Sequence, residues 1–327
     1  MVGGRAVRPV GVSRVAAIDC GTNSIRLLVA DVPATGAHAD LLRRMEVVRL
    51  GEGVDATGRL APQAIERTRR VLVEYADAAR DLGAEAVRMV ATSATRDAAN
   101  RGEFEEMVRA VLGQLPDVVA GTEEAALSFL GATTSLDAAA ASHGITPPRP
   151  PFLVVDIGGG STEFVLGDAD GVRAARSVDI GCVRMTERHL HGDPPSGEEV
   201  RRAEDDIRAA LTQVVADVPV SEAASLVGLA GSVTTVAALA LELPAYDPVA
   251  IHGSRIEADA VREVTAYLLA ATRERRAAMP VMHPGRVDVI GAGALVLRVI
   301  MEEFAFEEVA VSEHDILDGI ALRLARG

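Results

Sequence analysis

Hydrophobic and polar positions follow two alternating patterns along the chain, which predict strands and helices in turn. Short apolar runs are typical of buried strands, and longer stretches with apolar residues three and four positions apart are typical of helices. We expect strands at 15–19, 25–32, 45–50, 86–92, 117–120, 152–156, 162–167, 172–179, 225–230 and 307–311. We expect helices at 62–82, 101–115, 197–215, 232–243, 259–274 and 286–303, and others that begin near 122 and 313. Because strands and helices alternate throughout, the pattern predicts an α/β protein.

The pattern restarts after residues 137–151, where an alanine run and the segment T-P-P-R-P-P predict a rigid loop. A-I-D-C-G-T-N-S and V-V-D-I-G-G-G-S then share one form, since each has an aspartate at the end of a buried strand and a glycine-rich turn after it. Asp19 and Asp156 hold the matching positions. We therefore expect a two-lobed fold whose two turns face a shared cleft.

Composition narrows the classes of function. A chain of 327 residues with a net charge of −14 is long enough for about two domains and too acidic for a general nucleic-acid or membrane-surface binder. All 33 basic residues are arginine, and the absence of lysine excludes both a P-loop and Schiff-base chemistry. Two cysteines and an N-terminus without the apolar region of a signal peptide indicate a cytoplasmic protein.

The turn in D-I-G-G-G-S-T-E (156–163) has the residues best suited to bind an anion and a divalent cation. Three consecutive glycines allow the backbone to approach a ligand and to turn several N–H groups toward an anion. Asp156 can hold a hydrated divalent cation, and Glu163 can hold a second water or another edge of the cation. A tight hairpin in which the aspartate caps the turn is the alternative.

Two further segments have the groups that bind phosphate. D-C-G-T-N-S, with Arg26 after it, is a weaker form of the same motif and can equally form an ordinary turn. A-T-S-A-T-R (91–96) directly follows a strand, which places hydroxyl groups and Arg96 where they can grip phosphate oxygens, although a helix cap with a surface arginine is the alternative. In G-T-E-E (121–124), the acidic residues open a helix, where they ordinarily complement its dipole.

Two other patterns predict no site. V-I-G-A-G (289–293) imitates a dinucleotide fingerprint, but Val296 stands at the position of its third glycine. His314-Asp315 is not accompanied by histidines or aspartates at the spacing of metal ligands. We therefore expect the histidines to have ordinary solvated or capping roles.

From about Val15 to Ala325, the order of these motifs resembles the exopolyphosphatase / guanosine pentaphosphate phosphohydrolase (Ppx/GppA) family. The resemblance is carried by D-C-G-T-N-S-x-R, A-T-S-A-T-R-D-A-x-N, G-T-E-E-A-x-x-S-F-L-G, D-I-G-G-G-S-T-E, D-I-G-C-V-R-M-T-E and S-E-H-D-I-L-D-G. The sequence departs from the family at Cys20, Ala120, Gly231-Ser232 and Asp315, the last of which stands where a glycine is frequent.

The resemblance implies two ribonuclease-H-like lobes of the actin-like ATPase and sugar kinase superfamily around a central cleft. It implies domain I at 1–121 plus a C-terminal helix at 312–327, and domain II at 122–311, in place of a boundary at the proline-rich loop. It also implies that the C-terminal helical domains of longer members are missing.

The matching motifs imply a set of site residues. Glu124 resembles the family's catalytic base, and Glu163 a second catalytic carboxylate. Asp156, Glu163 and Asp19 resemble the carboxylates that organise Mg²⁺ (or Mn²⁺). The phosphate binders implied by the motifs are Asn23, Ser24, Arg26, Ser93, Arg96, Gly158, Gly159, Gly160 and Ser161.

The activity that the resemblance implies is Mg²⁺-dependent release of terminal phosphate from inorganic polyphosphate. Hydrolysis of guanosine pentaphosphate is the nearest alternative, and an ATP-binding kinase-like or regulatory phosphate-binding protein is an alternative of another class. Against a kinase stands Glu124, because a base poised for water suits hydrolysis. We expect no nucleic-acid or membrane partner, and family habit implies a homodimer.

Overall fold

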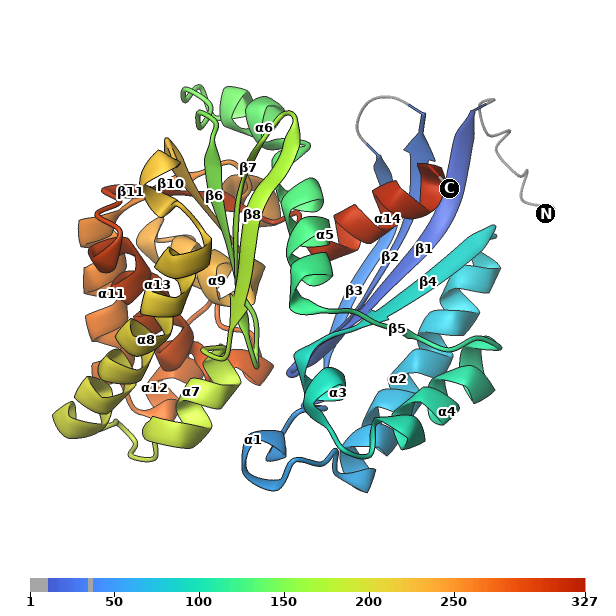
Figure 1. Cartoon of the computed structure of the whole chain (residues 1–327), viewed down its shortest axis with the longest axis horizontal. Helices are drawn as coiled ribbons and strands as arrows, with labels where there is room; N and C mark the ends of the chain where they lie inside the picture. The colour runs from blue at the N-terminus through green and yellow to red at the C-terminus, as the bar shows by residue number, and fades with distance from the viewer. Residues whose placement is uncertain (1–10, 35–37, 327) are drawn as a thin grey trace.

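A computed structural model of the chain describes residues 11–34 and 38–326, which form two lobes side by side (Figure 1). The N-terminal segment on which the expectation of no signal peptide rests lies largely outside these residues. Within the described residues, no helix is long and apolar enough to cross a membrane. The α/β class and the two-lobed arrangement expected from the sequence are confirmed.

The first lobe is built on a five-stranded sheet in the order β3-β2-β1-β4-β5. β1 pairs antiparallel with β2 and parallel with β4, so that the carboxyl ends of β1 and β4 meet at one edge. The elements of this lobe are β1 (Val12–Cys20), β2 (Ser24–Pro33), β3 (Ala39–Val47), α1 (Val54–Thr57), α2 (Pro62–Asp81), β4 (Ala86–Ala91), α3 (Ser93–Asp97), α4 (Arg101–Leu112), β5 (Asp117–Val118) and α14 (Ile316–Arg326).

Helices cover both faces of this first sheet, which is why β1 is a nearly continuous apolar run rather than an alternating one. One core holds residues of α2 and α4, such as Leu72 and Phe104, against one face of the sheet. A second core packs Ile320 of α14 against Ala17 and Leu28 on the other face. The last helix of the chain therefore belongs with its first strands.

The second lobe is built on a six-stranded sheet in the order β10-β11-β9-β6-β7-β8. Here β6 pairs antiparallel with β7 and parallel with β9, as β1 does with β2 and β4. The elements are α5 (Gly121–Thr133), α6 (Leu136–Ser142), β6 (Phe152–Ile157), β7 (Thr162–Asp168), β8 (Gly171–Val178), α7 (Cys182–His189), α8 (Gly197–Asp217), η1 (Val220–Glu222), β9 (Ser225–Leu229), α9 (Ala230–Ala240), α10 (Pro248–Ile251), β10 (Arg255–Glu257), α11 (Ala258–Ala270), α12 (Arg273–Ala277), η2 (Pro284–Arg286), α13 (Ile290–Glu303) and β11 (Glu308–Ser312).

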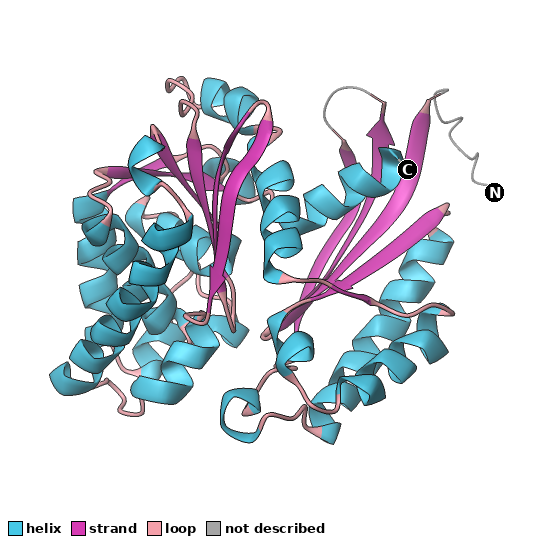
Figure 2. Ribbon diagram, in the orientation of Figure 1, coloured by secondary structure: helices cyan, strands magenta, loops and turns pink. Residues whose placement is uncertain are grey.

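Two helices join the lobes at the centre of the molecule (Figure 2). α5 packs on β7 and β8 of the second sheet and crosses α14, which packs on the first sheet. At the crossing, a Cβ atom added to Gly131 would lie 1.8 Å from the backbone oxygen of Asp315, and one added to Gly319 would lie 2.0 Å from that of Leu127. The two helices therefore touch through their backbones, and any larger side chain at either glycine would force them apart.

Three sequence expectations are wrong in detail. The strand expected at 45–50 is β3, Ala39–Val47, because the chain turns away from β2 after Val47 and reaches a left-handed conformation at Arg49 (φ 48°). The loop expected at 137–151 contains α6, since its alanine run favours a helix. The helix expected at 286–303 begins only at Ile290, after a short 3₁₀ turn.

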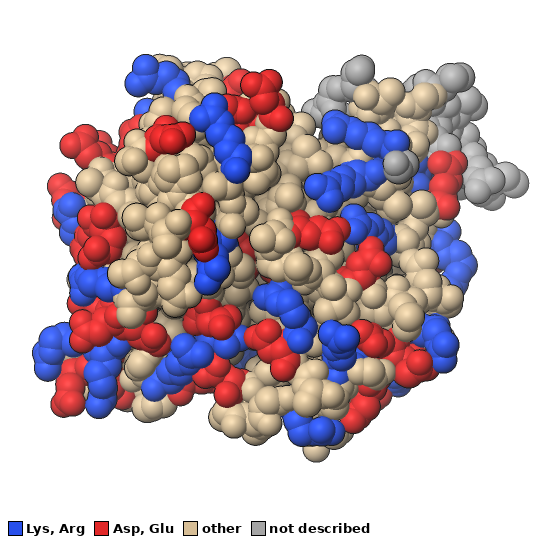
Figure 3. All heavy atoms as spheres, viewed as in Figure 1, with Lys and Arg blue, Asp and Glu red and all other residues tan. Residues whose placement is uncertain are grey.

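Ion pairs tie the mouth of the cleft between the lobes. Arg184 of α7 contacts Asp55 at 3.0 Å and Asp97 at 2.7 Å, both in the first lobe. On another side, Arg49 contacts Asp288 of the second lobe at 2.7 Å. On the face shown in Figure 3, acidic and basic side chains are likewise intermixed, rather than gathered into one continuous patch.

Candidate active site between the two lobes

A cavity of about 100 Å³ lies between the lobes, and the glycine-rich turns of both sheets line it. The sequence-predicted residues that line it are Asp19, Asn23, Ser24, Arg26, Ser93, Glu124, Asp156, Gly158, Gly159 and Ser161. Arg96, Gly160 and Glu163 stand outside this lining, but each contacts or faces a group that belongs to it, as described below. Segments more than a hundred residues apart in the sequence thus meet at one site, as the repeated turn motif predicts.

The two turns approach each other so closely that glycine is required. A Cβ atom on Gly159 would lie 2.9 Å from the Cβ of Thr22, and one on Gly160 would lie 2.7 Å from the hydroxyl oxygens of Thr22 and Ser93. Real Cβ atoms do not approach other atoms this closely, so an alanine at either position would push the turns apart. The hydroxyls of Thr22 and Ser93 in turn lie 3.0 Å apart, which links the first turn to the start of α3.

The start of α7 forms hydrogen bonds with the backbone of the second turn, which joins β6 to β7. The carbonyl oxygens of Gly158, Gly159 and Gly160 accept hydrogen bonds from the N–H groups of Cys182 (2.9 Å), Val183 (2.8 Å) and Gly181 (3.2 Å), respectively. In a trans peptide, the N–H group points away from the carbonyl of the same unit. The N–H groups that follow these carbonyls are therefore directed away from α7, which is the orientation that an anion-binding turn needs.

Glu124 and Ser128 lie four residues apart on one face of α5, where Glu124 lines the cavity and Ser128 bonds the cavity residue Asp156. The carboxylate of Glu124 accepts a hydrogen bond from Arg96 (3.1 Å), and the same Arg96 nitrogen donates to the carbonyl of Val119 (3.1 Å). The neighbouring Glu123 points elsewhere and pairs with Arg88, and its side chain is 42% exposed against 10% for Glu124. The helix thus buries one member of the glutamate pair and exposes the other.

Asp156 and Glu163 are cross-strand partners on β6 and β7. Serine hydroxyls donate to both carboxylates: Ser128 to Asp156 (2.6 Å), and Ser177 (2.7 Å) and Ser161 to Glu163. The sequence motif G-T-E-E-A-x-x-S contains Ser128, four residues after Glu124, and helix periodicity could have placed it in the site. Ser177 lies on β8, and only its register opposite Glu163 reveals its role.

Burial raises the pKa of Asp156, Glu163 and Glu124 above the ordinary carboxyl value. Repulsion adds to the effect, since Asp156 raises the pKa of Glu163, and Glu163 raises that of Glu124. Buried carboxylates of this kind need either a proton or a cation nearby. Oxygen ligands are those that Mg²⁺ and Mn²⁺ prefer, so the donor set fits a divalent cation.

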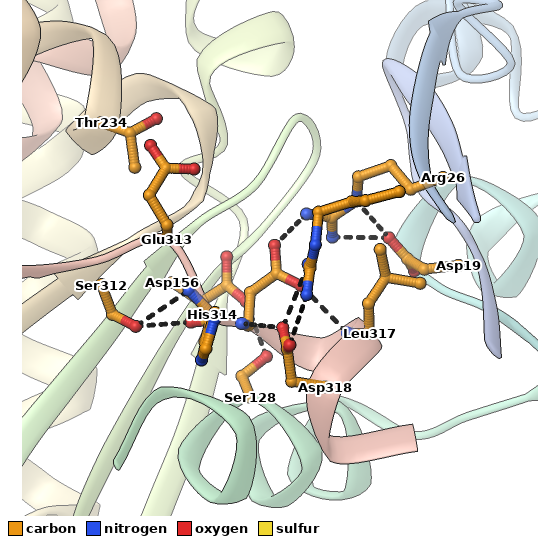
Figure 4. A network of polar contacts seen from close by, with 12 residues as sticks. Asp19, Arg26, Ser128, Asp156, Thr234, Ser312, Glu313, His314, Leu317 and Asp318 are labelled. Atoms are coloured by element: carbon orange, nitrogen blue, oxygen red, sulfur yellow. Dashed lines mark hydrogen bonds and ion pairs between the residues drawn. The ribbon is translucent and has the colours of Figure 1, made fainter. Parts of the chain in front are cut away.

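In the turn between β1 and β2, an arginine neutralises the charge of the carboxylate (Figure 4). Arg26 of β2 donates to one oxygen of Asp19 from Nε (3.0 Å) and Nη2 (2.6 Å), and its Nη1 donates to Asp315. The second oxygen of Asp19, Oδ1, is buried and has no hydrogen-bond partner among the described residues. Arg26, which the sequence predicts to bind phosphate, thus lines the cavity while bonded to two carboxylates.

Arg286 is a cavity residue that the sequence analysis missed. It donates to the hydroxyl of Thr235 (2.9 Å) and lies over the ring of Tyr246. A Cβ atom on Gly231 would lie 2.5 Å from its guanidinium, so the glycine provides the space that the arginine fills. Nothing in the local pattern distinguished Arg286 from other arginines, because its place depends on the packing of η2 against α9.

Four histidines gather near the start of α14, where the sequence analysis expected ordinary solvated or capping roles. The ring of His314 stacks on that of His252 at 4.4 Å between centroids, and both rings bond the hydroxyl of Ser135. His143 contacts the carbonyl of His252, and His38 pairs with Asp318 at 3.0 Å. His38, His314 and Asp318 lie close enough to share a metal ion, but both oxygens of Asp318 already accept hydrogen bonds from Arg43. Sequence spacing concealed this cluster because its members come from four separate segments.

A two-lobed α/β fold, paired glycine-rich turns and a set of buried carboxylates define a class of proteins that bind phosphate groups in a cleft. The chain belongs to the Ppx/GppA phosphatase family, whose model matches residues 28–326. This finding confirms the resemblance seen in the motifs and, with it, the expected fold.

Individual relatives agree with this assignment. Exopolyphosphatase 2 of Mycobacterium tuberculosis is 52% identical over 97% of this chain and 100% of its own length. A crystal structure of an exopolyphosphatase-like protein is similar with a TM-score of 0.89 and 39% identity, and it covers 95% of this chain and 98% of its own. A guanosine-5′-triphosphate,3′-diphosphate pyrophosphatase of Vibrio cholerae is 37% identical over 54% of this chain and 33% of its own length.

Proposed function

We propose that this protein is an exopolyphosphatase, a hydrolase that releases the terminal phosphate of inorganic polyphosphate. The observation that carries the proposal is the position of Glu124, which is buried at the start of α5, oriented by Arg96 and directed at the cavity that both glycine-rich turns line. The name of the M. tuberculosis relative, which is similar over nearly the whole chain, supports the choice of substrate.

Hydrolysis of a phosphoanhydride bond needs a positioned water, a group to accept its proton, and neutralisation of charge on the phosphoryl group. In the proposed reaction, the carboxylate of Glu124 accepts a proton from water as the water oxygen bonds to the terminal phosphorus. The P–O bond to the next phosphate breaks, and the chain leaves one phosphate shorter. General base catalysis of this kind contributes about 10²- to 10⁴-fold to the rate.

Asp156 and Glu163 are the residues that would hold Mg²⁺ or Mn²⁺, with Asp19 as a third candidate because its Oδ1 is buried without a partner. A divalent cation supplies charge neutralisation at the phosphoryl oxygens. A positive charge beside Asp156 and Glu163 also offsets the repulsion that raises the pKa of Glu124, which keeps Glu124 ionised and able to accept a proton.

The second turn is the proposed anion grip. Its N–H groups are directed away from α7, while Ser161 of the same turn and Ser93 of α3 line the cavity with hydroxyl groups. We also place Asn23, Ser24, Gly158, Gly159 and Gly160 in this grip. Arg96 bonds Glu124 directly, so we propose that it orients the base as well as attracting the polyanion.

Guanosine pentaphosphate is the second candidate substrate, and the name of the V. cholerae relative favours it. The same catalytic carboxylates serve both reactions, so the carboxylates alone do not separate them. An ATP-binding kinase-like protein, or a regulator that binds phosphate without turnover, is the alternative of another class. Glu124 disfavours both, because neither needs a base directed at water.

The direct test is to measure phosphate released from long-chain polyphosphate, guanosine pentaphosphate and ATP in parallel, each with Mg²⁺ and with EDTA. We expect Mg²⁺-dependent release that is fastest from polyphosphate. Faster release from guanosine pentaphosphate would establish the second candidate. Release from ATP alone, or from none of the three, would overturn the proposal and favour the kinase-like or regulatory class.

We further propose the division into domain I, residues 1–121 with 312–327, and domain II, residues 122–311. The packing of α14 on the first sheet and of α5 on the second supports this division. The homodimer and the cytoplasmic location also remain predictions. Light scattering coupled to size-exclusion chromatography tests the dimer, and fractionation of cells tests the location.

A further inference from the structure

Arg26 is the one guanidinium among the predicted phosphate binders that faces the cavity from the first sheet, yet each of its three nitrogens already donates to a carboxylate. A bidentate grip on phosphate uses two parallel N–H groups from one edge of the guanidinium. Asp19 occupies the edge formed by Nε and Nη2, because both nitrogens donate to its Oδ2. The remaining edge is formed by Nη1 and Nη2, and there Asp315 competes with a phosphate because it accepts from Nη1.

Asp315 also caps the N-terminus of α14, a role that is independent of any ligand in the cavity. It begins α14, where its Oδ1 accepts from the N–H of Leu317 (2.9 Å) and its own N–H donates to Asp318 (2.8 Å). This reciprocal arrangement is similar to a capping box, but the side chain of Asp315 bonds the N–H of the second helical residue rather than that of the third. The cap uses Oδ1, whereas the contact with Arg26 uses Oδ2, so the two tasks fall on different oxygens.

The two carboxylates that hold Arg26 are not equivalent. Asp19 lies on β1 directly opposite Arg26 and forms the cavity wall, so it belongs to the proposed metal-binding set. Asp315 is not part of the cavity lining, and it contacts Arg26 from the segment that begins α14. It is buried, with 5% of its surface exposed, so water screens its charge only weakly.

We propose that Asp315 is a specificity-determining residue that competes with the phosphate groups of the substrate for Arg26. This inference rests on the proposed function, since it takes the ligand of the cavity to be a condensed phosphate. By occupying Nη1, Asp315 weakens binding of the polyanion, and the cavity then relies on the second turn and on a divalent cation for its grip. A neutral residue at position 315 would free one edge of Arg26.

The test is calorimetric binding of tripolyphosphate to the full chain in EDTA, where no turnover is expected. Asp315→Asn removes the charge and keeps the cap, because asparagine caps helices as well as aspartate does. We expect this variant to bind tripolyphosphate about 5-fold more tightly, the size of one partly screened ion pair. In an Arg26→Gln background, the same change should bring no gain, because the released donor is gone.

One control variant and one substitute variant accompany the binding measurement. Asp40→Asn removes a carboxylate that pairs with Arg43 in the neighbouring network without contacting Arg26, and it should leave the dissociation constant unchanged. If Asp315→Asn fails to fold, Asp315→Ser, which also provides a capping oxygen, takes its place.

An unchanged affinity in the Asp315 variant, a gain that persists without Arg26, or no binding by any variant would overturn the inference. The phosphate-release assay of the wild-type protein is a separate measurement. A wild type that releases no phosphate from polyphosphate contradicts the proposed function, whereas the affinity ratio still reports on Asp315.

Discussion

The turn between β1 and β2 and the turn between β6 and β7 begin from the same sequence pattern but differ in how their charge is balanced. Asp19 of the first turn is fixed by a guanidinium, whereas Asp156 of the second turn receives one hydroxyl hydrogen bond from Ser128. The first turn thus contains its own counter-ion. Burial raises the pKa of Asp19 as well, but the charge and hydrogen bonds of Arg26 oppose that shift. The second turn leaves buried carboxylates without a hydrogen-bonded arginine among the described residues, and burial raises the pKa of Asp156 to about 6 and that of Glu163 to about 7.

One motif thus supplies two kinds of surface within a single cleft. A carboxylate with a fixed arginine partner is part of a rigid wall, and it gains little from a further cation. Carboxylates without such a partner are poised to bind one. The side of the cleft next to β6 and β7 is therefore where we place the cation and the base, and the opposite side is where we place the competition for phosphate.

Replacing the proposed base, Glu124, should have the largest effect on the rate of hydrolysis. Glu124→Gln preserves the shape of the side chain and removes the proton acceptor, so we expect kcat for polyphosphate to fall by about 10²- to 10⁴-fold with little change in melting temperature. Glu123→Gln is the matched control, because Glu123 is exposed and pairs with Arg88 away from the cavity. Equal and small effects of the two changes on steady-state rates would remove Glu124 from the chemistry.

The two aspartates themselves provide the next test. Asp156→Asn should raise the Mg²⁺ concentration needed for half-maximal activity by about 10- to 100-fold, the usual effect of disturbing a metal site. Asp19→Asn should raise it by less than 10-fold, because Arg26 already neutralises that carboxylate. Titration of activity with Mg²⁺ measures both. Similar increases in the Mg²⁺ requirement of the two variants would mean that both turns bind the cation equally. The proposed difference in charge balance between the turns would then be wrong.

Sequence reasoning found the parts of the site that lie in short contiguous patterns. The strand–Asp–Gly turns, Ser93 and the glutamate pair could be placed because each follows a predicted strand or opens a predicted helix. The family resemblance was needed to choose Glu124 over an ordinary helix-dipole role. The alternation of strands and helices predicted the α/β class, and the repeated turn motif predicted the two lobes.

What sequence could not show depends on contacts between distant segments. The bond between Arg26 and Asp315 joins residues 289 positions apart. The histidine cluster draws on four segments, which lie just before β3 and just after α6, α10 and β11. Arg286 enters the cavity only because Gly231 leaves space for it. Local periodicity contains no information about such pairs, since they are fixed by how the helices pack on the sheets.

The smallest expected effect is on stability, and its size distinguishes the two turns. Burial raises the pKa of Asp156 to about 6 and that of Glu163 to about 7, against about 4 for carboxyls in an unfolded chain. Between these values the folded protein binds more protons than the unfolded chain, so its free energy of unfolding decreases as the pH rises from about 4 to about 7.

In EDTA, we therefore expect the melting temperature to fall by a few degrees over that interval, and Mg²⁺ to restore it more at pH 7.5 than at pH 5, because the cation binds the ionised carboxylates. Thermal melts at several pH values, with EDTA and with Mg²⁺, measure both effects. Glu163→Gln should flatten the dependence, since it removes one titrating group, whereas Asp19→Asn should keep most of it, because Asp19 is paired with Arg26. A melting temperature that rises with pH in EDTA, or a stronger effect of Mg²⁺ at pH 5, would show that the second turn is already charge-balanced and does not need a cation.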